Sequence, residues 1–330
     1  MADYTYRNLT SAIADKASPL RLYLDQRFPN ARALQKDYRS RAGELRVPGG
    51  TANGGTLGAA FDFRMRFLID ASYVPEVAVH AFTARPDYER AVRGVIKHAQ
   101  KAAKGSNATE LDRACWALAL CTEAYRAGVG VVWSLVQLIE AGDFTVKRLL
   151  LLAPDDALRQ LVDLDALARE HLIPQLEAPF YLGPTFDGSM LCPADADVIS
   201  GGLLLDFKAG LKGGALTKEE LYQLLGYTFF DRSDRYGINR IGIYAARFGA
   251  LITWDLASTL ELLAGEPVDV AEERETVWGL LGGTGALKAR FVQVFGVDDG
   301  RFDDHSARGE DDDSGYGPDS YFARAMDKDD

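Results

Sequence analysis

Two aspartates and a lysine, Asp197, Asp206 and Lys208, lie close to one another in the sequence. Carboxylate oxygens are the ligands that Mg²⁺ prefers in proteins, and a neighbouring lysine can orient water or offset the charge of a phosphate. These residue types together can hydrolyse a phosphodiester bond with the help of one or two magnesium ions. That chemistry requires backbone elements that bring the three side chains to one place.

The elements around these residues are predicted to be strands joined by tight turns. Phe207 lies between Asp206 and Lys208, and alternate side chains of a strand share a face. Asp206 and Lys208 are therefore expected on one side, with Phe207 in the opposite layer. A hairpin turn at residues 200–202, rich in glycine, would place Asp197 beside Asp206. Short apolar runs predict the strands at 180–182, 190–192, 197–199 and 203–208.

A helix is predicted over residues 217–230, because Thr217 and Glu220 form the pattern of a capping box. Gln223 and Tyr227 are four residues apart in it, so both side chains lie on one helix face and can point to the same spot. Each site candidate alone is typical of a solvated surface or of ordinary packing, and Asp195 competes with Asp197 for the first acidic position. The prediction depends on the order and spacing of the whole set.

This ordered set resembles the PD-(D/E)xK nuclease superfamily, in particular its RecB-like exonuclease branch. Asp197 matches the first acidic position, Asp206 to Lys208 match the D/E-x-K element, and Gln223 with Tyr227 match the helix motif. The resemblance implies that Mg²⁺ or Mn²⁺ is bound by Asp197, Asp206 and the backbone carbonyl of Phe207. It also implies that Lys208 positions or activates the attacking water, and that the glutamine and tyrosine help to hold the site or the nucleic acid.

Two positions depart from the pattern of that branch. Gly58 to Asp62 stands where the branch has Gly-x-x-x-His, so an aspartate replaces the expected histidine. Asp62 is a candidate oxygen ligand for the metal, but an aspartate in the first turns of a helix is also favoured by the helix dipole alone. Ala196 replaces the proline before the first acid, a change that the branch tolerates.

The expected fold class is α/β, with a restriction-endonuclease-like PD-(D/E)xK core in which helices flank a mixed sheet. The predicted segments are 1–85 with N-terminal helices that include the core helix at Gly58 to Asp62, 86–172 as a helical insertion, 173–296 as the nuclease core and 297–330 as a disordered acidic tail. Two or three short helices are predicted over residues 5–40, and a glycine-rich loop at 47–58 is predicted to lead into a helix at 59–69. Further helices are predicted at 88–104, 109–128, 131–141, 145–152 and 155–171 and after the last strand, and further strands at 238–246 and 250–254.

The net charge of −11 argues against a nucleic-acid partner at first sight. Much of the acidic excess, however, follows Val297, and the body of the chain is only mildly acidic. The candidates for phosphate contacts are Arg64, Arg66, Lys212, Lys218, Arg232, Arg235, Arg240 and Arg247. The three cysteines give no disulfide framework, and no apolar segment is suited to a leader or a bilayer span, so a soluble cytoplasmic protein without a membrane partner is expected.

The leading hypothesis is a magnesium-dependent nuclease that acts on DNA more readily than on RNA, in genome (antiviral) defence or DNA repair. No phosphate-binding loop of an ATPase is present, so unwinding would come from a partner such as a helicase or a defence-system subunit. One alternative is a catalytically silent nuclease-fold subunit that binds nucleic acid or assembles with a partner. Another is a helical interaction protein whose sheet merely carries surface charges.

Overall fold

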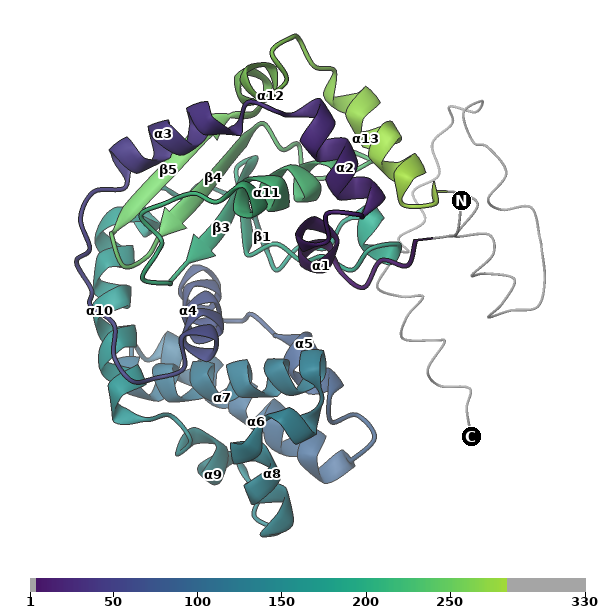
Figure 1. The fold of residues 1–330 in the computed structure, drawn as a ribbon. Helices are drawn as coiled ribbons and strands as arrows, with labels where there is room; N and C mark the ends of the chain where they lie inside the picture. Colours follow the sequence, from purple (N-terminus) through teal and green to yellow (C-terminus); the bar gives the residue numbers. More distant parts are fainter. Residues whose placement is uncertain (1–3, 284–330) are drawn as a thin grey trace, which may run out of the picture. The chain divides into compact units, whose positions relative to one another are not determined.

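A five-stranded mixed sheet lies between two groups of helices in the computed structural model, which describes residues 4–283 (Figure 1). The strand order follows the sequence, and all neighbours are antiparallel except the parallel pair β3 and β4. The predicted α/β class with a mixed sheet is confirmed, whereas the predicted acidic tail lies outside the described residues. The strands are β1 (Phe180–Leu182), β2 (Val198–Ser200), β3 (Leu203–Lys208), β4 (Arg240–Ala245) and β5 (Ala250–Asp255).

The hairpin between β2 and β3 has the tight turn that the sequence predicts. Ser200 pairs with Leu203, and the two residues between them, Gly201 and Gly202, have φ values of 54° and 79°. Positive φ at both central positions is the requirement of a type I′ turn, which glycine meets without strain. The register pairs Val198 with Leu205, and its continuation by one residue sets Asp197 opposite Asp206.

One face of the sheet carries Ile199, Leu204 and Ile243, which are fully or almost fully buried. The helix that connects the two parallel strands packs against this face. The capping box predicted at its start is confirmed. The Thr217 N–H donates to Glu220 Oε2 at 2.7 Å, and the Glu220 N–H donates to Thr217 Oγ1 at 3.1 Å. The helices of this side are α1 (Leu9–Ala14), α2 (Pro19–Arg27), α3 (Ala31–Arg41), α11 (Lys218–Phe230), α12 (Leu256–Ala264) and α13 (Val270–Leu280).

The opposite face packs against α4 (Gly54–Ile69), where the Phe61 ring lies 6.1 Å from the ring of Phe207. The helix begins five residues earlier than predicted, because the Asn53 side chain accepts hydrogen bonds from the N–H groups of Gly55 and Thr56. Such a cap satisfies donors that a helix start leaves free. Gly58 therefore lies within the helix, in agreement with a core helix at Gly58 to Asp62, and Asp62 lies beyond the first turn and not in it.

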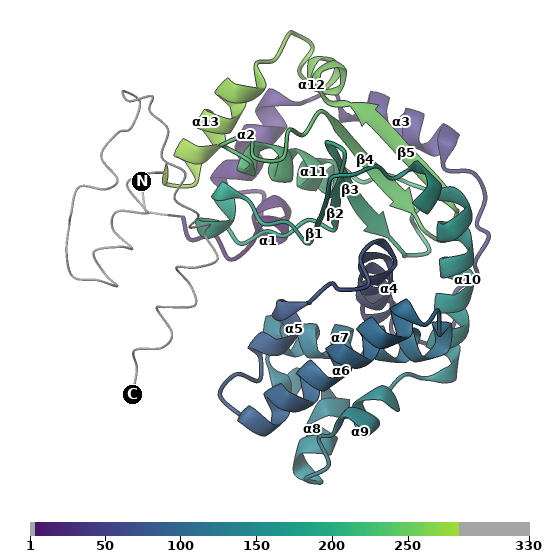
Figure 2. The same ribbon diagram turned by 180° about the vertical axis from the view of Figure 1, so that it is seen from behind.

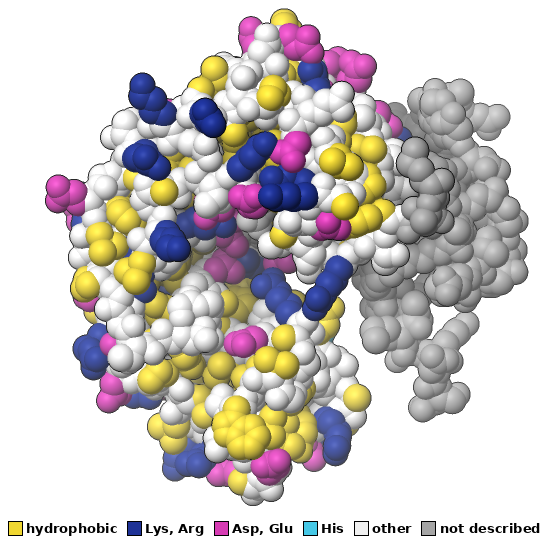
Figure 3. Space-filling model, in the orientation of Figure 1, with side chains coloured by type: hydrophobic (Ala, Val, Ile, Leu, Met, Phe, Trp, Pro, Cys, Tyr) yellow, Lys and Arg dark blue, Asp and Glu magenta, His cyan; other side chains and the backbone are white. Residues whose placement is uncertain are grey.

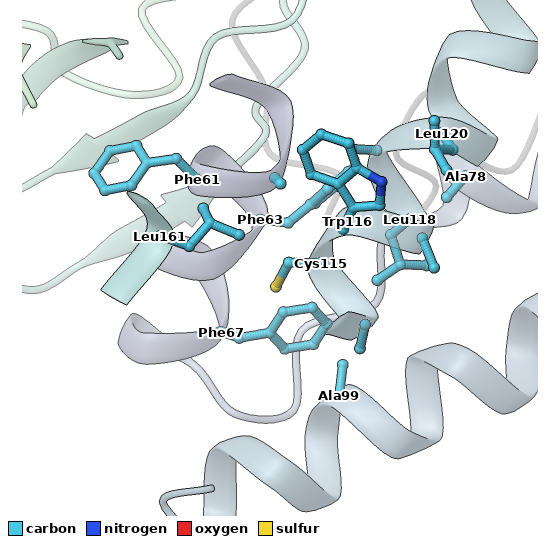
Figure 4. Packing of buried hydrophobic residues seen from close by; sticks show 14 of the residues in the cluster. Phe61, Phe63, Phe67, Ala78, Ala99, Cys115, Trp116, Leu118, Leu120 and Leu161 are labelled. Atoms are coloured by element: carbon cyan, nitrogen blue, oxygen red, sulfur yellow. The ribbon is translucent and has the colours of Figure 1, made fainter. Parts of the chain in front are cut away.

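The remaining helices form a second hydrophobic cluster around α7, and α4 contributes to it as well (Figure 4). Phe61 points toward the strands, whereas Phe63 and Phe67 lie on the side of Cys115, which is buried like the other two cysteines. A helix that is apolar on two sides is thus enclosed between the sheet and other helices. These helices are α5 (Glu76–His80), α6 (Pro86–Lys104), α7 (Ala108–Ala127), α8 (Trp133–Glu140), α9 (Val146–Leu150) and α10 (Asp155–His171).

The structure corrects one predicted strand. Residues 190–192 are not extended, since a short 3₁₀ helix, η3 (Asp187–Met190), ends there. The Ser189 hydroxyl accepts a hydrogen bond from the Phe186 N–H and donates one to the Ala194 carbonyl. A side chain that bonds the nearby backbone in this way competes with strand pairing. The other 3₁₀ turns are η1 (Val129–Val131) and η2 (Ile173–Gln175).

Helix α10 runs from the α7 cluster to the edge of the sheet, as Figure 2 shows from behind. A Cβ built at Gly249, in the turn before β5, would meet His171 at the end of α10, so the two elements are in close contact. The described residues up to Leu281 belong to one unit. Within residues 4–283, every helix is too short or too polar to cross a membrane.

Candidate active site

Asp197 and Asp206 meet across the β2–β3 hairpin, as their spacing predicts. Oδ2 of Asp197 accepts a hydrogen bond of 2.6 Å from the Phe207 N–H. The N–H and C=O groups of one strand residue point to the same side of the strand. The Phe207 carbonyl is therefore directed to the Asp197 side of β3, away from β4, while its side chain packs against α4 in the opposite layer.

Lys208 connects Asp206 to the helix α11. Its Nζ lies 2.6 Å from Asp206 Oδ2 and 3.4 Å from Gln223 Oε1, and Gln223 Nε2 in turn donates to the Tyr227 hydroxyl at 2.6 Å. Burial disfavours the charged ammonium, but the Asp206 carboxylate outweighs burial and holds the pKa of Lys208 above its usual value. The lysine is therefore charged at neutral pH, which suits it to hold an anion or orient water.

One oxygen of Asp206 is left without a hydrogen bond. Oδ2 is buried and has no hydrogen-bond partner in residues 4–283, so its ion-pair contact with Lys208 lacks the angles of a hydrogen bond. The Lys208 ammonium 2.6 Å away compensates for the burial of this oxygen, so the oxygen is ion-paired although no directed hydrogen bond reaches it.

Asp62 is brought to the same place but is engaged by an arginine. Arg66 follows it by one helical turn; its Nε donates to Asp62 Oδ1 at 2.8 Å and its Nη2 lies 2.6 Å from Oδ2. Nη2 also lies 3.8 Å from Oδ1 of Asp197. We call the group of Asp62, Asp197, Asp206, Arg66 and Lys208 the acidic site. Figure 3 shows a hollow on this face of the molecule, with acidic side chains inside it and basic side chains beside it.

Burial and mutual repulsion perturb two of these acids. The pKa of Asp197 is raised well above its usual value, chiefly by burial and further by the charges of Asp62 and Asp206. Burial also raises the pKa of Asp62, although the Arg66 charge opposes the shift. Perturbed acids of this kind concentrate at functional sites, where a charged ligand compensates for their burial.

The donors of the acidic site fit a magnesium or manganese ion in part. Hard carboxylate oxygens come from Asp197 and Asp206, and the Phe207 carbonyl is directed to the same side. No set of three or more His, Cys, Asp or Glu side chains in residues 4–283 is arranged to hold a metal. Both oxygens of Asp62 are taken by Arg66, which explains why the third acid does not complete such a set.

Two of the candidate phosphate contacts are structural instead. Arg64 is 1% exposed and pairs with Asp112 and Asp165 among the helices, and Arg247 is buried among backbone carbonyls. Asp195, the rival of Asp197, forms an exposed ion pair with Arg126 at 3.1 Å. The structure thus groups the predicted site residues but removes these two arginines from the predicted basic cleft.

Two residues of the site have no counterpart in the sequence analysis. The Tyr73 hydroxyl accepts a hydrogen bond of 2.8 Å from Arg66 Nη1. A Cβ on Gly183 would lie 2.2 Å from the same nitrogen, so this glycine makes room for the guanidinium. The positive φ of Gly183, 65°, accords with a turn between Leu182 and Pro184, and that turn is the one local signal available.

The chain was also compared with known proteins. No family model, no curated protein and no solved structure matches it.

Proposed function

We propose that this protein is a metal-dependent nuclease that hydrolyses phosphodiester bonds, with DNA as the favoured substrate. The observation that supports this best is the meeting of Asp197, Asp206 and Lys208 at one place, with the buried Asp206 carboxylate ion-paired to Lys208. Two acids and a lysine in such contact supply ligands for a divalent cation and a positive charge for a phosphate.

Each residue has a defined task in this proposal. Asp197 and Asp206, with the Phe207 carbonyl, hold Mg²⁺ or Mn²⁺, and the bound ion supplies Lewis-acid activation of water and charge for the phosphate. Lys208 orients the attacking water and offsets charge that develops on the phosphate. Gln223 fixes the Lys208 ammonium from α11, and Tyr227 fixes Gln223.

The sheet supports a PD-(D/E)xK-like core as the finer description of the fold. The acids lie on an antiparallel hairpin, and α11 connects the second strand of that hairpin to a parallel neighbour. We further propose a setting in genome defence or DNA repair within the cytoplasm, where a partner such as a helicase separates the strands.

The direct test is incubation of the full chain with labelled single- and double-stranded DNA and RNA, in Mg²⁺, Mn²⁺ or chelator. Cleavage by the wild type that stops in chelator is expected, with none by Asp206→Asn and a loss of at least roughly 100-fold by Lys208→Met. Asp143→Asn is the matched control, and it should cleave like the wild type because its side chain forms an exposed ion pair with Arg148 and contacts no residue of the acidic site.

The alternatives give other results in the same assay. Metal-independent binding of nucleic acid without cleavage, equal in the wild type and Asp206→Asn, would support a catalytically silent subunit. Cleavage that survives Asp206→Asn would contradict the proposed site.

A further inference from the structure

Arg66 is less exposed than Lys208, the other cation of the acidic site. It reaches Asp62 with two nitrogens, at 2.8 and 2.6 Å, and its Nη2 is 3.8 Å from Oδ1 of Asp197. One guanidinium therefore lies between two carboxylates of the site. Lys208 lies against the third, Asp206.

The position of Arg66 is fixed by its surroundings. Its side chain is 5% exposed, Nη1 donates to the Tyr73 hydroxyl, and the guanidinium carbon lies 5.6 Å from the Tyr73 ring centre and 5.8 Å from that of Phe63. On another side, Gly183 has no side chain to interfere. Hydrogen bonds, aromatic faces and a backbone gap hold the guanidinium in a built socket.

The charges of the acidic site then favour a single divalent ion. Once metal binding has displaced the proton of Asp197, the three carboxylates give three negative charges, and Arg66 with Lys208 gives two positive ones. One divalent cation beside Asp197 and Asp206 more than balances the remaining charge. A second cation between Asp62 and Asp197 would have to displace the guanidinium or lie against it, and the repulsion of like charges at such distances is strong where water is excluded.

We propose that Arg66 takes the place of a second metal ion, so that the site binds one divalent cation only. This inference rests on the proposed metal-dependent function and specifies how it operates. Asp62 then becomes a positioning residue, whose carboxylate holds the arginine instead of a metal. This role accounts for an aspartate at the position where the RecB-like branch has a histidine, because a carboxylate binds a guanidinium through two oxygens and an imidazole does not.

The test is the number of Mn²⁺ ions bound by the full chain, measured by calorimetry and by electron paramagnetic resonance. The wild type should bind one ion per chain, with the spectrum of an isolated ion. Arg66→Met should bind two ions with a coupled spectrum, and the double variant Arg66→Met with Asp62→Asn should return to one. Arg66→Lys is the matched control that keeps the charge, and it should bind one.

Two results would overturn the inference: two ions in the wild type, or a single ion in a folded Arg66→Met. If Arg66→Met fails to fold, the wild-type measurement still tests the inference, because two bound ions would overturn it. Failure of the proposed function gives a different result. The wild type would then bind no Mn²⁺, or only Mn²⁺ that Asp206→Asn binds equally well.

Discussion

Asp197 combines burial with two acidic neighbours, and this has a direct consequence for metal binding. Its raised pKa means that the folded protein retains a proton on this carboxyl to higher pH than an ordinary aspartate does. A metal ion binds the ionised form, so binding must release that proton. Asp62 has a raised pKa as well, but its guanidinium partner already favours ionisation.

The affinity of the wild type for Mn²⁺ is therefore expected to rise with pH above the range in which ordinary aspartates titrate. The sign follows from the raised pKa, because protons compete with the ion below it. Calorimetry in two buffers of different ionisation enthalpy measures the protons released. An affinity that stays constant with pH above that range, without proton release, would show that Asp197 is already ionised.

Gly183 offers a test of the Arg66 socket that leaves every charge in place. Gly183→Ala puts a Cβ at a positive φ and 2.2 Å from Arg66 Nη1, so the guanidinium must shift. We expect a loss of about 1–3 kcal/mol in the free energy of unfolding. Gly43→Ala is the matched control, since its φ of 74° brings the same backbone strain and its Cβ would meet nothing within 4 Å. Urea unfolding of both variants separates the cost of the contact with Arg66 from that of backbone strain. Equal losses of unfolding free energy in the two variants would mean that the socket adjusts freely.

The contrast between Arg64 and Arg66 shows which part of the site could be read from the sequence. Strand alternation and a glycine turn predicted the meeting of Asp197, Asp206 and Lys208, because those rules act over a few residues. The two arginines lie two residues apart on one helix, yet Arg64 pairs with Asp112 and Asp165 while Arg66 enters the acidic site. The partners of Arg64 come from distant parts of the chain, so no local pattern shows them. Asp62 lies one helical turn before Arg66, and that spacing is a local signal for this pair alone, whereas the approach of Arg66 to Asp197 has none.

At the scale of the element, α11 carries two site residues and starts at a cap remote from them. Thr217→Ala removes the side-chain acceptor at the helix start and is expected to cost about 1 kcal/mol in the free energy of unfolding. Cleavage should persist, because Gln223 and Tyr227 lie about two and three turns further along. Asp255→Ala, at the cap of α12, is the control with a comparable cost and no link to the site. Urea unfolding with the cleavage assay measures both, and a loss of cleavage in Thr217→Ala alone would show that the cap positions the site.

Elements with strong local signals were predicted well, and those set by a single side chain were not. Helix α10 has its predicted ends, and so do β1 and β3. The early start of α4 depends on the Asn53 cap, and the turn at 187–190 depends on Ser189. In the first case one polar side chain outweighs the glycine-rich composition of the residues that follow it, and in the second it outweighs a short apolar run.

On the scale of the molecule, Arg247 connects three segments, and two of them lead directly to elements that carry residues of the acidic site, namely β3 and α4. Nε donates to the Ala209 carbonyl, next to Lys208, and Nη1 donates to the Pro48 carbonyl in the segment that leads to α4, each at 2.7 Å. Nη2 donates to Gln160 of α10, also at 2.7 Å. A single buried guanidinium thus satisfies acceptors from the sheet, from the entry to α4 and from the helical cluster.

Arg247→Met is expected to lower the free energy of unfolding by more than about 3 kcal/mol, because it strands several buried acceptors that each cost about 1–3 kcal/mol when unpaired. Cleavage should fall only as far as the folded fraction falls, since Arg247 contacts no acid of the site. Lys208→Met is the opposite case, with cleavage lost and cooperative unfolding retained. Urea unfolding followed by circular dichroism, with cleavage measured on the same samples, separates the two. A stable Arg247→Met without cleavage would contradict this expectation. It would mean that the arginine acts on the site through the position of Lys208. It would also mean that the apolar contact of Phe61 with the sheet is enough to hold α4 and the helical cluster against the sheet.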